Sequence, residues 1–421
     1  MTQSRIDDRA RQVLEDNDRG GYTVPNGRVY PFQWNWDSAF AALGFARFDP
    51  QRAWLEIDRL LSAQWADGFL PHIVFWKEDP GYFPGPALWQ TGTTPPTSGI
   101  TQPPIAASVV RWLWESTDQS LFRPSLERML PKLLAWHRWF HRFRDPLAGG
   151  GILAVHPWET GRDNSPEWDA PAAVIDTSKV GAYQRRDTTH LDAAMRPTQR
   201  DYDRYMALVA FGREVGWDHA KIAATNPFRV VDVGMTMILL RADRDLAALA
   251  DSLGLVAEAA ELRERVAQAQ AGVSYLWDDE VGSYCSRDTI TGRSSGVVTS
   301  ASFLSFYAGI RDERRDRRML QHLERIAQRV KYLLPSLDPD DPRFDRIRYW
   351  RGPVWVVVSF LVAKGLAEAG ENGWAERIRA DARALIESSG FYESFCPVTG
   401  RGTGGGDFSW TAAMWLHWAG A

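Results

Sequence analysis

Apolar residues recur at helical spacing along most of this chain of 421 residues. In DSAFAALGFARF (37–48) and LERMLPKLLAWHRWFHRF (126–143) they stand at i, i+3, i+4 and i+7, the spacing that gives a helix one apolar face. With the two ends of the chain included, we expect about a dozen helices and an all-α fold. The remaining helices are predicted over 50–65, 103–117, 202–217, 230–254, 256–277, 314–334, 352–370 and 374–390.

These helices arrive in pairs, and short and long connections alternate between them. A helical hairpin is too small to bury its own apolar face, so a series of hairpins is expected to close into a barrel of helices. The long connections, 66–104, 144–197 and 391–408, are rich in Pro and Gly and are expected to form a lid at one end of the barrel. Because no linker divides the chain, residues 1–421 are predicted to form one domain.

One segment departs from helical spacing. VGSYCSRDTITGRSS (281–295) has a Thr-Gly turn between two strand-like runs, which predicts a small β-hairpin. No run approaches the roughly 18 apolar residues that a membrane helix needs. The first residues, MTQSRIDDRARQVLEDN, contain no apolar stretch of the signal-peptide kind, so the expected location is cytoplasmic, with no membrane partner.

Charge and motif content exclude several function classes. The net charge is −4 and no basic stripe is present, which argues against a nucleic acid partner. Cys285 and Cys396 stand outside any CxxC cluster, and His137 and His141 lack the glutamate of an HExxH motif, so no metal site is expected. GTGGG (402–406) lacks the lysine of a phosphate loop, so we expect a flexible lid hinge and no cofactor.

The chain contains 20 tryptophans, and several stand beside acidic residues in polar or Pro/Gly-rich stretches. In HPWETGRDNSPEWD (156–169) four acids and two tryptophans share a segment that its prolines and glycine keep from forming one helix. Pyranose rings stack on aromatic faces while their hydroxyl groups need charged partners, so this pattern indicates sugar binding. Glycoside hydrolysis in turn needs two carboxyl groups. The candidates in loops are Asp37, Glu159, Asp163, Asp203 and Glu393.

Five motifs, spread in order over residues 30 to 418, together resemble glycoside hydrolase family 63: FQWNWDSAF, LPHI, HPWETGRDNSPEWD, RYWRGPVW and GFYESFCPVTGRGTGGGDFSWTAA. The resemblance is to its compact bacterial and archaeal-type branch, which hydrolyses mannosylglycerate and glucosylglycerate. It implies an (α/α)6 barrel, a lid of long inter-helix loops, and metal-independent hydrolysis with inversion at the anomeric carbon. The chain is therefore expected to be an inverting α-glycosidase acting on a small charged glycoside.

The resemblance also implies roles for individual residues. Asp163 corresponds to the general acid, beside an aromatic wall such as Trp158, and Glu393 to the general base. Glu159 and Asp169 are expected to bond backbone N–H groups or arginines in the loop. Arg196 and Tyr202 are our choices for the carboxylate of glycerate, which needs an arginine fork or a tyrosine hydroxyl. The other residues expected to bind substrate are Tyr30, Trp34, Trp36, Asp37, His72, Tyr82, Gln102, Trp158, Tyr349, Trp350 and Arg351.

Other functions stay open at this point. The same fold and chemistry would suit a trehalase-like hydrolase of a neutral disaccharide. A sugar epimerase or isomerase is disfavoured because the eight histidines are scattered, and a noncatalytic sugar-binding protein would have no need for two loop acids. Mannose and glucose remain equal alternatives for the nonreducing sugar, and a homo-oligomer is possible.

Overall fold

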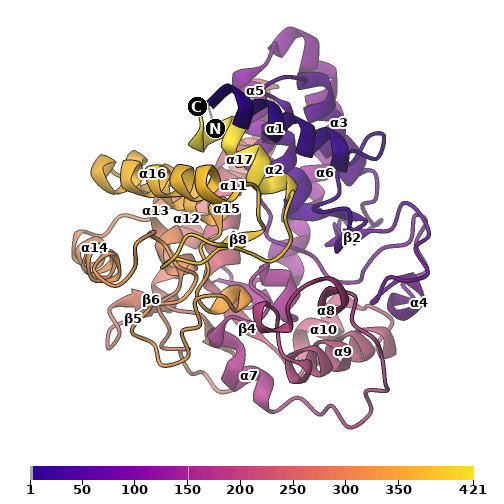
Figure 1. The fold of residues 1–421 in the computed structure, drawn as a ribbon. Coiled ribbons are helices and arrows are strands. Elements are labelled where there is room, and N and C mark those ends of the chain that lie inside the picture. The colour runs from indigo at the N-terminus through magenta and orange to yellow at the C-terminus, as the bar shows by residue number, and fades with distance from the viewer. Residues whose placement is uncertain (1–2, 150) are drawn as a thin grey trace.

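Six inner helices contact one another in a closed ring at the centre of the molecule, in the order α2, α5, α11, α13, α15, α17 and back to α2. The computed structural model describes residues 3–149 and 151–421 (Figure 1). The ring makes the fold an (α/α)6 barrel, as the sequence predicted. Its members are α2 (Asn35–Phe45), α5 (Ala106–Ser116), α11 (Val233–Ser252), α13 (Leu304–Tyr307), α15 (Val356–Glu368) and α17 (Ser409–Met414).

A second layer of helices surrounds this ring. The difference between the layers follows from sequence, because every residue of α2 is buried whereas α14 buries only Met319, Leu323 and Ile326, one face of an otherwise charged helix. Five outer helices pack on inner ones, and α14 contacts strand β6 (Ser283–Tyr284). The outer layer consists of α1 (Gln3–Asn17), α3 (Pro50–Leu61), α6 (Gln119–Phe143), α12 (Val256–Gly272), α14 (Glu313–Ala327) and α16 (Asn372–Ser389).

The helix predictions are correct in kind and differ mainly at the ends. Helix α6 begins at Gln119 and continues across Pro124 and Pro131, so it is longer than the predicted 126–143. The first three residues of the predicted 230–254 helix instead form strand β4 (Val230–Asp232). Two β-branched valines precede Asp232, whose side chain accepts a hydrogen bond from Met235 N and begins helix α11.

The connection between α6 and α11 is the longest one in the fold. Its helices α8, α9 and α10 gather with α4 (Pro86–Trp89) on one side of the molecule (Figure 1), and α4 contacts α9. The helix predicted over 202–217 therefore does not belong to the barrel. Apolar spacing shows that a helix packs on another element, but it does not identify that element. The connection contains β3 (Ile152–Ala154), η1 (Pro157–Thr160), η2 (Pro166–Trp168), α7 (Asp169–Ala173), α8 (Asp187–His190), η3 (Ala193–Met195), α9 (Gln199–Glu214) and α10 (His219–Thr225).

Short antiparallel strand pairs hold together the segments that connect the helices. Strand β1 (Gln33–Trp34) pairs with β2 (Ile73–Val74), β3 with β4, and β8 (Ser394–Phe395) with β9 (Gly402–Thr403).

No helix in residues 3–149 or 151–421 is both long and apolar enough to cross a membrane.

The hairpin predicted over 281–295 is only partly correct. Its Thr-Gly turn exists, since Asp288 N donates to Arg293 O. However, β6 pairs with β5 (Trp277–Asp278) and β7 (Arg287–Asp288) pairs with β4. Strand-like spacing specified the strands, but their partners lie elsewhere in the chain.

Candidate active site

The lid connections and the ends of the inner helices enclose a cavity of about 760 Å³, its open mouth included. An aromatic lining with a limited number of polar groups is typical of a site for a small ligand. Aromatic residues are the largest group in the wall, namely Tyr30, Trp34, Trp36, Tyr82, Phe83, Trp158, Tyr202, Tyr349, Trp350, Phe408 and Trp410. Polar groups reach the cavity at a few places, namely Asp37, His72, Gln102, Asp163, Arg186, Asp187, Arg196 and Glu393.

The structure brings the sequence-predicted residues together in this cavity, with one exception. Arg351 does not line it, and its guanidinium instead pairs with Asp169. Tyr349, Trp350 and Arg351 form the short turn η6 (Tyr349–Arg351), whose backbone is irregular, since Tyr349 has a φ of +46° and Trp350 has non-helical angles. Tyr349 and Trp350 line the cavity, whereas Arg351 does not.

Asp163 is partly buried at the cavity wall and carries a perturbed carboxyl group. Burial raises its pKa from 3.8 to about 7, Glu393 adds to the rise, and Arg196 opposes it. The hydroxyl of Tyr205 donates to the backbone carbonyl of Asp163 at 2.8 Å. A carboxyl group with this pKa is half protonated at neutral pH, so Asp163 can donate a proton to a bound ligand.

Glu393 is almost fully buried and is surrounded by hydrogen-bond donors. The Tyr30 hydroxyl donates to Oε1 at 2.9 Å, and Gly405 N donates to Oε2 at 3.2 Å. Arg196 Nη1 lies 3.5 Å from Oε1 and 3.4 Å from Oε2. These contacts fix the orientation of the Glu393 carboxyl group at the cavity wall, within reach of a ligand or a water molecule.

The glycine run at 402–406 forms part of the wall around Glu393. Gly404 has a φ of +72°, and a Cβ there would stand 2.2 Å from Glu393 Oε2. A side chain at this position would displace the carboxylate. The run therefore has a steric reason to be glycine, besides the hinge function expected from its sequence.

Two charged residues of the cavity, Arg186 and Asp187, were missed by the sequence analysis. Asp187 accepts from Arg196 Nε at 2.9 Å, and Arg196 and Arg185 lower its pKa to about 2 against the opposing effect of burial. Arg186 donates to Asp79 Oδ2 at 2.8 Å, across two lid connections. The available signal was the charged segment QRRDTTH within a long loop, but nothing in it indicates which side chains point inward.

The wall near Asp37 carries groups suited to neutral hydroxyls. Burial, followed by the charges of Glu393 and Asp163, raises the pKa of Asp37 well above its usual value. His72 Nδ1 lies 2.6 Å from Ser98 Oγ, and burial and the nearby His156 hold its pKa well below the usual range. Gln102 Oε1 accepts from Trp36 N at 3.1 Å.

Glu159 and Asp169 bond arginines or backbone N–H groups, as predicted. Glu159 accepts from Arg144 Nη2 at 3.1 Å and from Val155 N at 2.9 Å, and Asp169 pairs with Arg351. Neither acid lines the cavity.

The described residues contain no group of three or more His, Cys, Asp and Glu side chains arranged to hold a metal ion. His137 and His141, four residues apart, both bond to Asp243 instead, at 2.7 and 2.8 Å.

Comparison with known proteins identifies close relatives. The model of the mannosylglycerate hydrolase MGH1-like glycoside hydrolase domain matches residues 30–411. Mannosylglycerate hydrolase MGH1 of Selaginella moellendorffii is 46% identical over 410 residues, which cover 97% of this chain and 84% of the relative. Glucosylglycerate hydrolase of Mycolicibacterium hassiacum is 35% identical over 443 residues, covering 100% of this chain and 99% of the relative.

A solved structure matches equally well. The GH63 mannosylglycerate hydrolase from Thermus thermophilus, crystallised with Tris and D-glycerate, superposes with a TM-score of 0.94 at 46% identity. The match covers 98% of this chain and 99% of that one.

Proposed function

The chain belongs to the family of MGH1-like glycoside hydrolases, and from this premise we propose that it hydrolyses 2-O-α-mannosyl-D-glycerate, 2-O-α-glucosyl-D-glycerate or both to free sugar and D-glycerate. One observation carries the proposal. Asp163 and Glu393 line the same aromatic cavity in different environments: burial raises the pKa of Asp163, whereas Glu393 is held by the Tyr30 hydroxyl, with Arg196 close by.

In this proposal Asp163 donates its proton to the oxygen between the anomeric carbon and glycerate as that bond breaks. Glu393 removes a proton from a water molecule whose oxygen attacks the anomeric carbon from the opposite face. The sugar leaves with inverted configuration, and proton exchange with solvent restores both carboxyl groups. Such a mechanism requires the two carboxyl groups to stand roughly 6.5 to 9.5 Å apart, leaving room for the water.

The sugar is proposed to bind against the wall formed by Trp34, Trp36 and Trp158. These indoles supply flat faces for the ring, and Asp37, with a pKa raised by burial, is available as a hydroxyl donor or acceptor. His72 and Gln102 are proposed to complete the hydroxyl contacts. Mannose and glucose differ only at C2, and we propose both as substrates for testing.

The carboxylate of glycerate is proposed to bind Arg196 and Tyr202, with Arg186 as a second cation. Both arginines line the cavity, and a guanidinium binds a carboxylate through charge-assisted hydrogen bonds. Tyr202 lies under the guanidinium of Arg185, which is 3.7 Å from the ring centre. Each guanidinium already pairs with a carboxylate, Arg196 with Asp187 and Glu393 and Arg186 with Asp79, and we propose that their remaining N–H groups favour an anionic aglycone over a neutral sugar.

A panel of α-glycosides tests the proposal. The purified enzyme is incubated with mannosylglycerate, glucosylglycerate, trehalose and kojibiose, and released sugar is measured at several concentrations. We expect kcat/KM for at least one glycosylglycerate to exceed that for the neutral disaccharides by about 100-fold, the value of one or two charge-assisted hydrogen bonds. Preference for a neutral disaccharide would overturn the assignment of the aglycone.

A further inference from the structure

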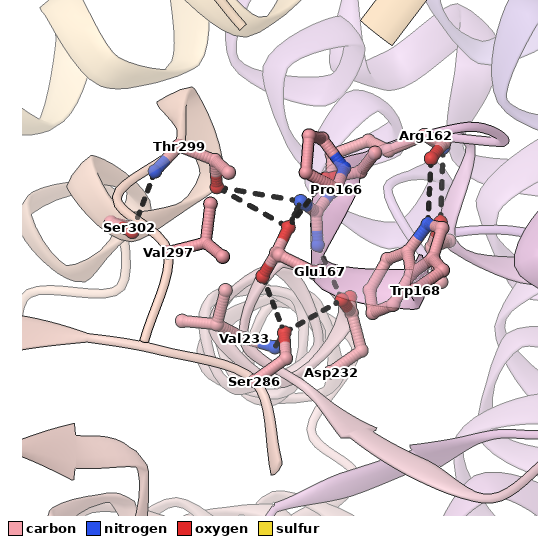
Figure 2. Close-up of polar contacts among 12 residues, drawn as sticks. Arg162, Pro166, Glu167, Trp168, Asp232, Val233, Ser286, Val297, Thr299 and Ser302 are labelled. Atoms are coloured by element: carbon pink, nitrogen blue, oxygen red, sulfur yellow. Dashed lines mark hydrogen bonds and ion pairs between the residues drawn. The ribbon is translucent and has the colours of Figure 1, made fainter. Parts of the chain in front are cut away.

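Arg162, the residue before Asp163, is buried with its guanidinium between two carboxylates (Figure 2). Nη1 bonds Glu167 and Nη2 bonds Asp232, and all three side chains are almost completely inaccessible to solvent. Ser286 Oγ donates to Glu167 Oε1 at 2.7 Å, so Glu167 is itself held from a second segment. None of these residues lines the cavity.

This cluster ties the loop to the barrel. Asp232 ends strand β4 and caps inner helix α11 by accepting from Met235 N at 2.6 Å. Thr299, which precedes η5 (Ser300–Phe303), lies 3.4 Å from both Arg162 Nη1 and Glu167 Oε2. Arg162 is therefore bonded to Asp232 at the start of inner helix α11 and to Thr299, and it is linked through Glu167 to Ser286.

The backbone of Arg162 closes the turn that contains Asp163. Ser165 N donates to Arg162 O at 3.0 Å, which places Asp163 and Asn164 at the two central positions of a four-residue turn. Trp168 Nε1 donates to the same carbonyl at 2.8 Å (Figure 2). The Ser165 hydroxyl donates to Glu167 Oε2 at 3.0 Å, so both ends of the turn are fixed to Glu167.

We propose that Arg162 is the positioning residue for Asp163: its side chain, clamped by Glu167 and Asp232, fixes the turn that holds the carboxyl group of Asp163 at the cavity wall. The inference rests on the proposed function, in which Asp163 is the general acid. A planar guanidinium bonds both carboxylates at once in a fixed geometry, which a lysine ammonium does not reproduce. A displacement of about 1 Å at a reacting group lowers a rate by up to about 100-fold.

Arg162→Lys tests the inference, because lysine keeps the charge and removes the fork. Two substrates are compared, the glycosylglycerate and the α-glycosyl fluoride of the same sugar, whose fluoride leaves without a proton from the enzyme. We expect kcat for the glycosylglycerate to fall about 10- to 100-fold with KM within about threefold, while hydrolysis of the fluoride changes less than about threefold. An equal effect on both substrates, or no effect on either, would overturn the inference.

Arg241→Lys is the matched control. Arg241 is also buried and bonds two carboxylates, Asp245 and Glu368, but unlike Arg162 it has no sequence neighbour that lines the cavity. We expect it to lower the melting temperature and to leave the ratio of the two activities unchanged. If Arg162→Lys does not fold, Ser286→Ala removes one donor to Glu167 and is expected to shift the ratio in the same direction by a smaller factor. An unchanged ratio in that variant would also overturn the inference.

Asp163→Asn separates this inference from the proposed function. If Asp163→Asn hydrolyses the glycosylglycerate at the wild-type rate, the proposed general acid is wrong. If it loses that activity and keeps the fluoride activity, while Arg162→Lys affects both substrates alike, the proposed function stands and only the role of Arg162 fails.

Discussion

Arg196 and Glu393 are joined in the cavity wall, with Arg196 Nη1 3.4 Å from Glu393 Oε2. The arginine proposed to bind the glycerate carboxylate is thus also a partner of the proposed base. We propose that this guanidinium couples binding of the substrate to the position of the attacking water.

Because of this coupling, substitutions of Arg196 and Tyr202 are expected to have different kinetic effects. We expect Arg196→Ala to raise KM for the glycosylglycerate and also to lower kcat about 10-fold or more, because Glu393 loses a charged donor. Tyr202→Phe is expected to raise KM about 10-fold with little change in kcat, since only a hydroxyl contact is lost. Steady-state kinetics measure both. Tyr183→Phe, whose hydroxyl bonds Asp203 outside the cavity lining, is the control. Equal effects on kcat in both variants would contradict the coupling.

Removing either proposed catalytic carboxyl group is expected to abolish most turnover. Asp163→Asn and Glu393→Gln keep side-chain size, so each should fold and bind substrate while kcat falls about 10² to 10⁴-fold. Steady-state rates and calorimetric binding of the substrate check the two halves of this expectation. Asp203, expected from the sequence to lie in a loop, is instead part of helix α9 and lies outside the cavity lining, so Asp203→Asn is expected to be nearly neutral. Activity within about threefold of wild type in either active-site variant would remove that residue from the mechanism.

The pKa of Asp163 sets the expected pH dependence. A general acid works only when protonated, and burial raises this pKa to about 7. We therefore expect kcat/KM for the glycosylglycerate to fall about tenfold per pH unit above this pKa. Hydrolysis of the α-glycosyl fluoride, which needs no proton donor, should lack this alkaline limb. A flat profile up to about pH 9 for the glycosylglycerate would show that Asp163 does not act as the acid.

The lid connections are expected to become ordered when ligand binds. Arg186 joins Asp79 at 2.8 Å and Phe83 stacks on Tyr183 with ring centroids 4.7 Å apart, so residues 66–104 and 144–197 meet over the cavity. Hydrogen exchange with and without a glycosylglycerate measures the change. We expect slower exchange in 67–102 and 391–408 in the bound state. Equal protection of 67–102 in both states would mean that this connection is a fixed wall.

The helices of the barrel could be predicted because the apolar spacing that indicates a helix is a local property of the sequence. Apolar spacing identifies an inner helix such as α2 or an outer one such as α14 without knowledge of the partner. The same spacing misplaced α9, which packs in the lid region, because the spacing does not specify which surface a helix covers.

Some residues of the site were predicted correctly from the sequence, and others were missed or misplaced. Asp163 and Glu393 stand in motifs with fixed neighbours, so the resemblance located them. Arg186 and Asp187 lie at the start of the four-residue helix α8, which is too short to give the sequence a readable periodicity. Arg351 was misplaced for a related reason, since its turn is short and irregular and its guanidinium pairs with Asp169.

The anomeric configuration of the first sugar released tests the central claim most directly. Proton NMR during hydrolysis of mannosylglycerate or glucosylglycerate records that sugar before mutarotation. Direct attack by the water that Glu393 activates, with Asp163 protonating the leaving oxygen, should give the β anomer together with D-glycerate. Initial appearance of the α anomer would contradict the account.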